Sequence, residues 1–387
     1  MASGVAEEST ITTTVPAPKE QPTKRDAGSS KPTRLGSLDA LRGFDMFWIS
    51  GGTDFFLALF RIIAPPVAGF LGVQFNHPAW NGFTFYDLIF PLFIFMSGLS
   101  IPLSINKRLE RGDSKAKLYK HVAVRTLLLF LLGALNNGAQ FDPFETRFAG
   151  VLQRIAICSC VASIIAMNTR PRTQVYIAGG ILLAYWAIMA LIPVPGFSAG
   201  DYSPEGNLAG YIDRLLLPYP DKWCCYGFGD SEGILGTLPA ISTALLGVLA
   251  GHWLRADHPH KEKCLKMIYA GGICLGLGTA WNFAFPINKY MWTSSYVLFT
   301  GGWSMLLVVL FYWIIDVRGH KKWAFYFSVI GMNSILMYMF RSTADFDFLV
   351  DLSGDTFFLP LVAASMRLAV NWFVLYLLYR KKWFLKL

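Results

Sequence analysis

Apolar segments of about 20 residues recur along this chain, separated by short loops that carry most of its charges. Lipid cannot satisfy backbone polar groups, so a segment that crosses a bilayer must be a helix or part of a closed barrel. The apolar runs are longer and more uniform than barrel strands, which alternate in polarity. Only 15% of the residues are charged, against about a quarter in a soluble domain. We therefore expect an all-α, polytopic integral membrane protein in a lipid bilayer.

Hydropathy predicts about ten membrane spans. Their approximate ranges are 36–62, 86–106, 119–137, 148–168, 174–193, 234–254, 267–285, 293–315, 324–341 and 357–379. The loops on one side carry most of the Lys and Arg residues, whereas the opposite loops carry only Arg147, Arg214, Lys222, Lys289 and Arg341. Because cytoplasmic loops hold the excess of basic residues, we expect both termini in the cytoplasm.

The sequence divides into a polar tail and a membrane domain. Residues 1–34 are rich in Ser, Thr, Pro, Lys and Glu and lack the apolar run of a signal peptide, so a disordered cytoplasmic tail is expected. Residues 35–387 hold the spans, and the long outer loop 194–233 is expected to cap the bundle. In that loop the adjacent Cys224 and Cys225 fit either a disulfide or two packed thiols.

The net charge of +9 does not indicate a nucleic-acid partner. The basic residues lie in short loops between apolar helices, which is the topology signal of a membrane protein rather than one basic soluble face. The sequence also lacks zinc-ligand spacing, a nucleotide-binding glycine loop and a Gly-x-Ser-x-Gly elbow, so no metal site is expected.

A polar turn precedes the second span and contains the sole histidine expected on the outer side, His77. Pro78 restricts the backbone of His77, and Asp87 follows ten residues later at the mouth of the span. A carboxylate at that depth is costly unless it is paired or faces a cavity, and an aspartate beside a histidine can orient the imidazole for base catalysis. The alternatives are a structural histidine and a helix-capping Asp87.

A second polar cluster begins the first span. Ser37 fits a helix N-cap, and Asp39, Arg42 and Asp45 are spaced three residues apart, so they share a helix face near the cytoplasmic boundary. A helix N-terminus beside an arginine favours phosphate. A cluster that only pins this helix to its neighbours fits the spacing equally well.

Two further sets of polar residues interrupt apolar runs. Gln153-Arg154 lies within the fourth span, where an unpaired arginine should face a cavity or an anion. Asp230 and Glu232 lie at the outer mouth of the sixth span, where a polar substrate would enter, although ordinary helix-start carboxylates explain them as well.

The motifs together resemble one family. They are SLDALRGFD at 37–45, HPAWNGFTFYDLIFP at 77–91, GVLQRIA at 150–156, EGILGTLP at 232–239, FPINK and WTSSY within 285–296, and GMN at 331–333. The chain resembles, over roughly residues 35–380, the transmembrane acyltransferase family of heparan-α-glucosaminide N-acetyltransferase and its bacterial, NagX-like relatives.

This resemblance implies an enzyme that takes acetyl-CoA from the cytoplasmic side and transfers the acetyl group to the amine of a terminal glucosamine on the other side. The residues that it implies are catalytic His77, supported by Asp87, and CoA-binding Ser37, Asp39, Arg42, Gln153, Arg154 and Asn333. Beside these we expect Asn81 to take part in catalysis and Trp80, Asp54, Asp230 and Glu232 to bind the substrate. Arg42 and Arg154 would hold the CoA phosphates near the inner face. Direct transfer and a covalent acetyl-His77 intermediate both remain open.

The sequence departs from the family pattern in two places. The N-terminal span and luminal domain of the lysosomal enzyme have no counterpart here, so we expect a bacterial inner-membrane protein, and a homodimer is compatible with the sequence. Animal members carry an asparagine near the outer end of the first span. In this chain Ser50, Thr53 or Asp54 takes over the role of that asparagine, or the role is missing. The competing function is an amino-sugar transporter, which would also need an outer polar site among ten helices.

Overall fold

The computed structural model describes residues 35–138, 147–218, 226–340 and 357–385, together with Met1, Phe346 and Phe348. Almost all of the expected tail, and Cys224 and Cys225, lie outside these residues. The regular elements within them are helices, and nine segments are long and apolar enough to cross a membrane, so the expected polytopic all-α class is confirmed. The protein is therefore a multi-pass membrane protein, and the side on which its termini lie stays a prediction.

The helices follow one another in this order. They are α1 (Gly36–Phe47), a π-helical turn (Trp48–Gly52), α2 (Thr53–Ile63), α3 (Pro65–Gln74), a 3-10 turn (Phe85–Leu88), α4 (Ile89–Leu109), α5 (Lys115–Asn136), α6 (Val151–Asn168), α7 (Pro171–Leu191), α8 (Leu208–Leu216), α9 (Ile234–Arg255), α10 (His260–Trp281), α11 (Ser294–Phe311), a second π-helical turn (Tyr312–Val317), α12 (Ala324–Gly331), α13 (Ser334–Phe340) and α15 (Leu359–Arg380).

The ninth expected span, 324–341, is not one helix. It is split into α12 and α13 at Met332-Asn333, and each piece is shorter than the roughly 20 residues that a helix needs to cross a bilayer. The first span is also interrupted, because Gly51 adopts a φ of +114° within its π-helical turn. Only glycine adopts that conformation without strain.

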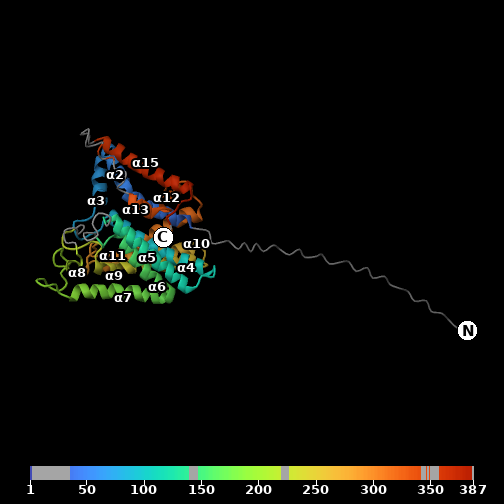
Figure 1. The fold of residues 1–387 in the computed structure, drawn as a ribbon, viewed down its shortest axis with the longest axis horizontal. Coiled ribbons are helices and arrows are strands. Elements are labelled where there is room, and N and C mark those ends of the chain that lie inside the picture. Colours follow the sequence, from blue (N-terminus) through green and yellow to red (C-terminus); the bar gives the residue numbers. More distant parts are fainter. Residues whose placement is uncertain are drawn as a thin grey trace. The chain divides into compact units, whose positions relative to one another are not determined.

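Small residues let the central helices approach closely. A Cβ on Gly247 of α9 would lie 1.9 Å from the carbonyl oxygen of Phe95 on α4, and one on Gly43 of α1 would lie 1.7 Å from that of Phe327 on α12. Such contacts are how membrane helices gain packing energy without a hydrophobic drive between them. Figure 1 shows α2, α12, α13 and α15 grouped beside one another, with α4, α6, α7 and α9 forming the other part of the bundle.

Segments far apart in the sequence meet at one end of the bundle. α8 and the end of α7 pack with Phe285 and Met291 in one apolar cluster. The Gly82 amide donates to the Ile287 carbonyl at 2.9 Å, and the Tyr296 hydroxyl donates to the Asp87 carbonyl at 2.6 Å. These contacts bring residues 76–87, 230–233 and 285–292 together around the site described next.

Candidate active site

The imidazole of His77 is hydrogen-bonded to a fully buried carboxylate. His77 Nδ1 lies 2.6 Å from Asp87 Oδ1, and the side chain of Asp87 is 0% exposed. Asp87 ends a short capping box with Thr84, whose backbone amide donates to Asp87 Oδ2 at 3.1 Å. A carboxylate on Nδ1 favours the tautomer that carries its proton there and leaves Nε2 as the acceptor. This arrangement is the one that general-base catalysis uses.

Lys289 lies against the same imidazole. Its Nζ is 2.8 Å from His77 Nε2, 3.2 Å from His77 Nδ1 and 3.8 Å from Asp87 Oδ1. Because the two ring distances are nearly equal, the ammonium lies across the ring rather than in line with one lone pair. Burial lowers the pKa of Lys289 below its usual value, and the nearby carboxylates of Asp87 and Glu232 oppose this effect.

The segment that carries Lys289 is tied to the histidine segment by an asparagine pair. Asn288 Nδ2 lies 3.0 Å from both Asn81 Oδ1 and the Trp80 carbonyl. The Asn81 side chain is therefore used to join two segments, and Asn81 is not among the residues that line the cavity. This contact holds the segment of Lys289 beside the segment of His77, and the expected catalytic role of Asn81 stays a prediction.

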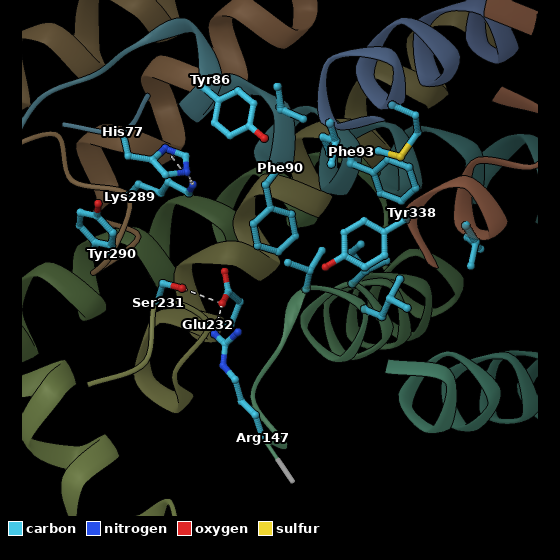
Figure 2. Close-up of a pocket in the computed structure, with 17 residues that line it drawn as sticks. His77, Tyr86, Phe90, Phe93, Arg147, Ser231, Glu232, Lys289, Tyr290 and Tyr338 are labelled. Carbon is cyan, nitrogen blue, oxygen red and sulfur yellow. Dashed lines mark hydrogen bonds and ion pairs between the residues drawn. The ribbon is translucent and has the colours of Figure 1, made fainter. Parts of the chain in front are cut away.

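His77 and Lys289 open onto a cavity of about 240 Å³. Its polar residues are His77, Tyr86, Arg147, Ser231, Glu232, Lys289, Tyr290 and Tyr338, and its apolar residues are Met46, Ile49, Ile89, Phe90, Phe93, Val151, Leu152, Ile155 and Ile335. Figure 2 shows His77 and Lys289 on one wall and Ser231, Glu232 and Arg147 on another, with Phe90 to the right of both groups. The cavity thus has a charged part and a larger apolar part formed by α1, α4, α6 and α13.

The carboxylate of Glu232 faces this cavity from a buried ion cluster. Arg147 bonds both Asp230 and Glu232, and the Ser231 hydroxyl donates to Glu232 Oε2 at 2.6 Å. Burial alone would raise the pKa of Glu232, but the charges of Arg147 and Arg154 outweigh it and lower that pKa. Burial raises the pKa of Asp230 despite its bond to Arg147. Glu232 is therefore ionised at neutral pH and presents a negative charge to the cavity.

Arg154 belongs to this end of the bundle. It lies in the first turn of α6, is 1% exposed, donates to the Gly233 carbonyl at 3.1 Å and sits 4.9 Å from the ring centre of Trp292. Arg42 instead bonds Ser100 of α4. Ser100 lies 11 residues beyond the start of α4, which is about 16 Å along the helix axis. The structure therefore does not bring Arg42 and Arg154 together, because the two arginines lie at different depths of the bundle. The expected binding of CoA phosphates at the inner face stays a prediction.

The start of α1 is already capped from within the chain. The backbone amides of Gly36 and Ser37 donate to the Asp316 carboxylate at 3.1 and 3.2 Å. Ser37 is one residue inside the helix rather than at its N-cap, and Asp316 occupies the place where a phosphate was expected. Asp39 lies 3.6 Å from Arg42 on the same helix.

The arginine of α1 has a second cation beside it. Arg125 of α5 is close enough for its charge to repel that of Arg42, and its Nε is buried without a hydrogen-bond partner among the described residues. Two neighbouring guanidinium groups in a membrane interior favour an anion between them.

Two residues expected to bind CoA, Asn333 and Gln153, do not line the cavity. Both polar atoms of the Asn333 side chain bond the C-terminal segment, Nδ2 to the Trp383 carbonyl at 3.1 Å and Oδ1 to the Leu385 amide at 2.9 Å. Gln153 packs against Gly133 and Gly150 and does not line the cavity. Neither side chain is thus directed at the cavity.

Two residues expected to bind the sugar lie near or beyond the cavity rim. Trp80 donates through Nε1 to the Tyr202 carbonyl at 2.7 Å and stacks on Tyr290, with ring centres 5.5 Å apart. Asp54 pairs with Arg367 at 3.0 Å, is half exposed and is not among the residues that line the cavity. Trp80 therefore supports the rim through Tyr290, whereas Asp54 lies away from it.

Sequence reasoning did not assign Lys289, Arg147, Tyr86, Tyr290 or Tyr338 to the site. A signal for two of them was present, because Lys289 and Arg147 are among the few basic residues of the outer loops. The tyrosines carry no such signal, since aromatic residues are common at membrane interfaces.

The family described as "Domain of unknown function (DUF5009)" matches residues 34–202. The chain is 30% identical over 416 residues to heparan-alpha-glucosaminide N-acetyltransferase of Homo sapiens and 30% identical over 413 residues to that of Mus musculus. These alignments cover 93% and 92% of this chain but only 61% and 62% of the two relatives, so the chain spans less than two thirds of their length. The resemblance indicated by the motifs is confirmed.

Proposed function

We propose that this chain, a DUF5009-type relative of heparan-alpha-glucosaminide N-acetyltransferase, is a membrane acetyltransferase that moves the acetyl group of cytoplasmic acetyl-CoA to the amine of a glucosamine-type sugar on the other side of the membrane. The proposal is carried by one observation. His77, which buried Asp87 orients, lines one cavity together with the cation Lys289 and the ionised carboxylate Glu232. The direction of transfer rests on the predicted topology.

His77 is the proposed general base. The sugar amine attacks the thioester carbonyl, a C–N bond forms, and Nε2 of His77 takes the proton that the amine loses. The C–S bond then breaks, and the CoA thiolate takes up the proton from His77. Asp87 stabilises the imidazolium that exists between these two steps, which is the role of the carboxylate in such pairs.

Lys289 is the proposed electrostatic group. Its ammonium lies 2.8 Å from His77 Nε2, so a tetrahedral intermediate that forms beside His77 would have this positive charge close to its negative oxygen. A cation held in a water-poor site stabilises such charge more strongly than it would in water.

Glu232 is the proposed anchor of the acceptor. Free glucosamine is mostly an ammonium ion at neutral pH, and an ionised carboxylate in the cavity attracts it. The bound ammonium releases one proton to solvent before the neutral amine attacks, so that His77 takes only the second proton. Ser231 and Tyr290 supply further hydrogen-bonding groups on the cavity wall for sugar hydroxyls. Arg147, which bonds both Asp230 and Glu232, keeps this carboxylate in place.

Arg42 and Arg125 are the proposed site for the phosphates of CoA. Arg125 has a buried and unpartnered Nε in the described part of the chain, and the two cations repel each other unless an anion lies between them. From there the acyl arm would follow α1 and α4 to the apolar part of the cavity, where Met46 and Phe93 lie.

Purified protein in detergent tests this proposal with [1-¹⁴C]acetyl-CoA and glucosamine. We expect labelled N-acetylglucosamine from the wild type and none above background from His77→Ala. A matched control is His258→Ala, since His258 lies in the loop before α10 and pairs with Glu262 outside the cavity. Counterflow of unmodified glucosamine in proteoliposomes free of acetyl-CoA would overturn the proposal, because it would show transport without acetyl transfer.

A further inference from the structure

A groove of about 380 Å³ lies between α10 and α11, apart from the cavity of His77. This α10–α11 groove is lined by Lys261, Cys264, Leu265, Ile268, Val309, Leu310 and Trp313. Cys264 and Val309 are buried at its base, whereas Leu265, Ile268 and Leu310 are between 42% and 52% exposed. The groove is therefore open on the outer surface of the bundle, where lipid surrounds a membrane protein.

The α10–α11 groove is charged at one end and apolar along the rest. Lys261 lies in the first turn of α10, and Ile268 lies seven residues further, which is about 10 Å along the helix axis. Within the described residues, the side chain of Lys261 has neither an ion pair nor a hydrogen bond. The predicted topology places this end of α10 at the cytoplasmic boundary of the membrane.

A second cation contacts the aromatic residue of the groove. The guanidinium of Arg318 lies 5.5 Å from the ring centre of Trp313. Arg318 directly follows the π-helical turn at the end of α11, and it has no carboxylate partner in the part of the chain that the structure describes. Tryptophan is enriched at the level of the lipid headgroups. Trp313 thus indicates that both cations lie at that level.

This charge pattern favours one occupant. An anionic phospholipid carries a phosphate at the headgroup level and apolar chains below it, which matches a lysine above Leu265 and Ile268. Basic pockets between membrane helices on the cytoplasmic side bind such headgroups. A second copy of the chain fits less well, because a symmetric partner in the same orientation would bring its own Lys261 to the same depth of the bilayer, where like charges repel.

We propose that the α10–α11 groove is a binding site for an anionic phospholipid, whose phosphate binds Lys261 and Arg318. One acyl chain of this lipid lies along Leu265, Ile268 and Leu310. The inference goes beyond the proposed function and does not depend on it, since the groove shares no lining residue with the cavity of His77.

Native mass spectrometry of the full chain in detergent tests the site, with phosphatidylglycerol and phosphatidylcholine of identical acyl chains as probes. Wild-type protein should bind phosphatidylglycerol about fivefold more tightly or better, the factor that one basic residue near an anionic headgroup contributes. Lys261→Gln should lower the affinity for phosphatidylglycerol about fivefold and leave that for phosphatidylcholine unchanged. Lys266→Gln is the matched control, because Lys266 of the same helix pairs with Glu262 at 2.8 Å and does not line the groove.

Equal affinities of wild-type protein for the two lipids would overturn the proposal, and so would equal losses in Lys261→Gln and Lys266→Gln. Binding of free sn-glycerol 3-phosphate as tight as that of phosphatidylglycerol would also overturn it, because the acyl chains would then contribute nothing. A lipid-free dimer that Leu310→Trp dissociates would assign the groove to a second copy instead. If Lys261→Gln does not fold, Arg318→Gln serves, and an unchanged affinity of that variant for phosphatidylglycerol would contradict the site.

Discussion

His77 Nδ1 lies 2.6 Å from Oδ1 of Asp87, a carboxylate that has no exposed surface. The pairing holds a titratable ring at the mouth of an apolar helix, where an unpaired carboxylate would be expensive. It also separates two tasks, since Asp87 fixes the ring and Nε2 remains for a substrate proton.

Substitution of either member of this pair should remove most of the activity. We expect His77→Ala to lower kcat by roughly 10²–10⁴-fold, the usual contribution of a general base. Asp87→Asn should lower kcat by about 10²-fold or more, because the amide no longer stabilises the imidazolium. Initial rates of acetyl transfer at saturating acetyl-CoA measure both effects, and a kcat within twofold of wild type for His77→Ala would contradict the assignment.

The alkaline side of the pH–rate profile should report Lys289. Burial lowers the pKa of Lys289, so its ammonium is lost at a lower pH than that of an exposed lysine. Activity should therefore fall as pH rises through that lowered pKa. Lys289→Arg keeps the charge and should move the fall in kcat to higher pH, whereas Lys289→Met should lower kcat at every pH. An alkaline limb that is identical in wild type and Lys289→Arg would exclude this role.

Glu232→Gln should weaken use of the amine acceptor selectively. A hydrogen bond to a charged group contributes about 1.5–3 kcal/mol, so kcat/KM for glucosamine should fall about 10- to 100-fold while KM for acetyl-CoA stays unchanged. Asp54→Asn is the matched carboxylate control, because Asp54 pairs with Arg367 outside the cavity. Equal losses in both variants would show that the effect is general destabilisation rather than acceptor binding.

The close contact of α4 and α9 should tolerate no added carbon. A Cβ on Gly247 would lie 1.9 Å from the Phe95 carbonyl oxygen, so Gly247→Ala must push the two helices apart. We expect a loss of about 1–3 kcal/mol of stability, as for other overpacked interiors. Gly272→Ala is the control, since nothing lies within 4 Å of its added carbon. Thermal unfolding in detergent compares the two, and similar Tm values would contradict this packing.

The positions of the long apolar helices could be predicted from the sequence, because hydropathy alone determines them. The described structure has nine long segments at the expected places, with shifted ends such as α10, which begins at His260 rather than at 267 because its first turns are charged. The break between α12 and α13 was not predictable from hydropathy. It coincides with Asn333, whose side chain bonds the backbone some 50 residues later.

The candidate site was predictable where its contacts are local. His77 and Asp87 are ten residues apart, and the turn between them is visible in the sequence. Lys289 is 212 residues from His77, so only a folded chain reveals that contact. The place of Arg154 could also have been predicted, because the expected topology already put this residue near the outer end of its span. The expectation that Arg154 and Arg42 share a phosphate site rested on the family resemblance and not on the position of Arg154 in its span.

Acetyl transfer from one side of the membrane to the other should depend on His77 as the general base. Proteoliposomes with [1-¹⁴C]acetyl-CoA on the predicted cytoplasmic side and glucosamine on the other side test this dependence most directly. We expect labelled N-acetylglucosamine on the glucosamine side with wild-type protein and none above background with His77→Ala. Equal amounts of labelled product from the two proteins would contradict it.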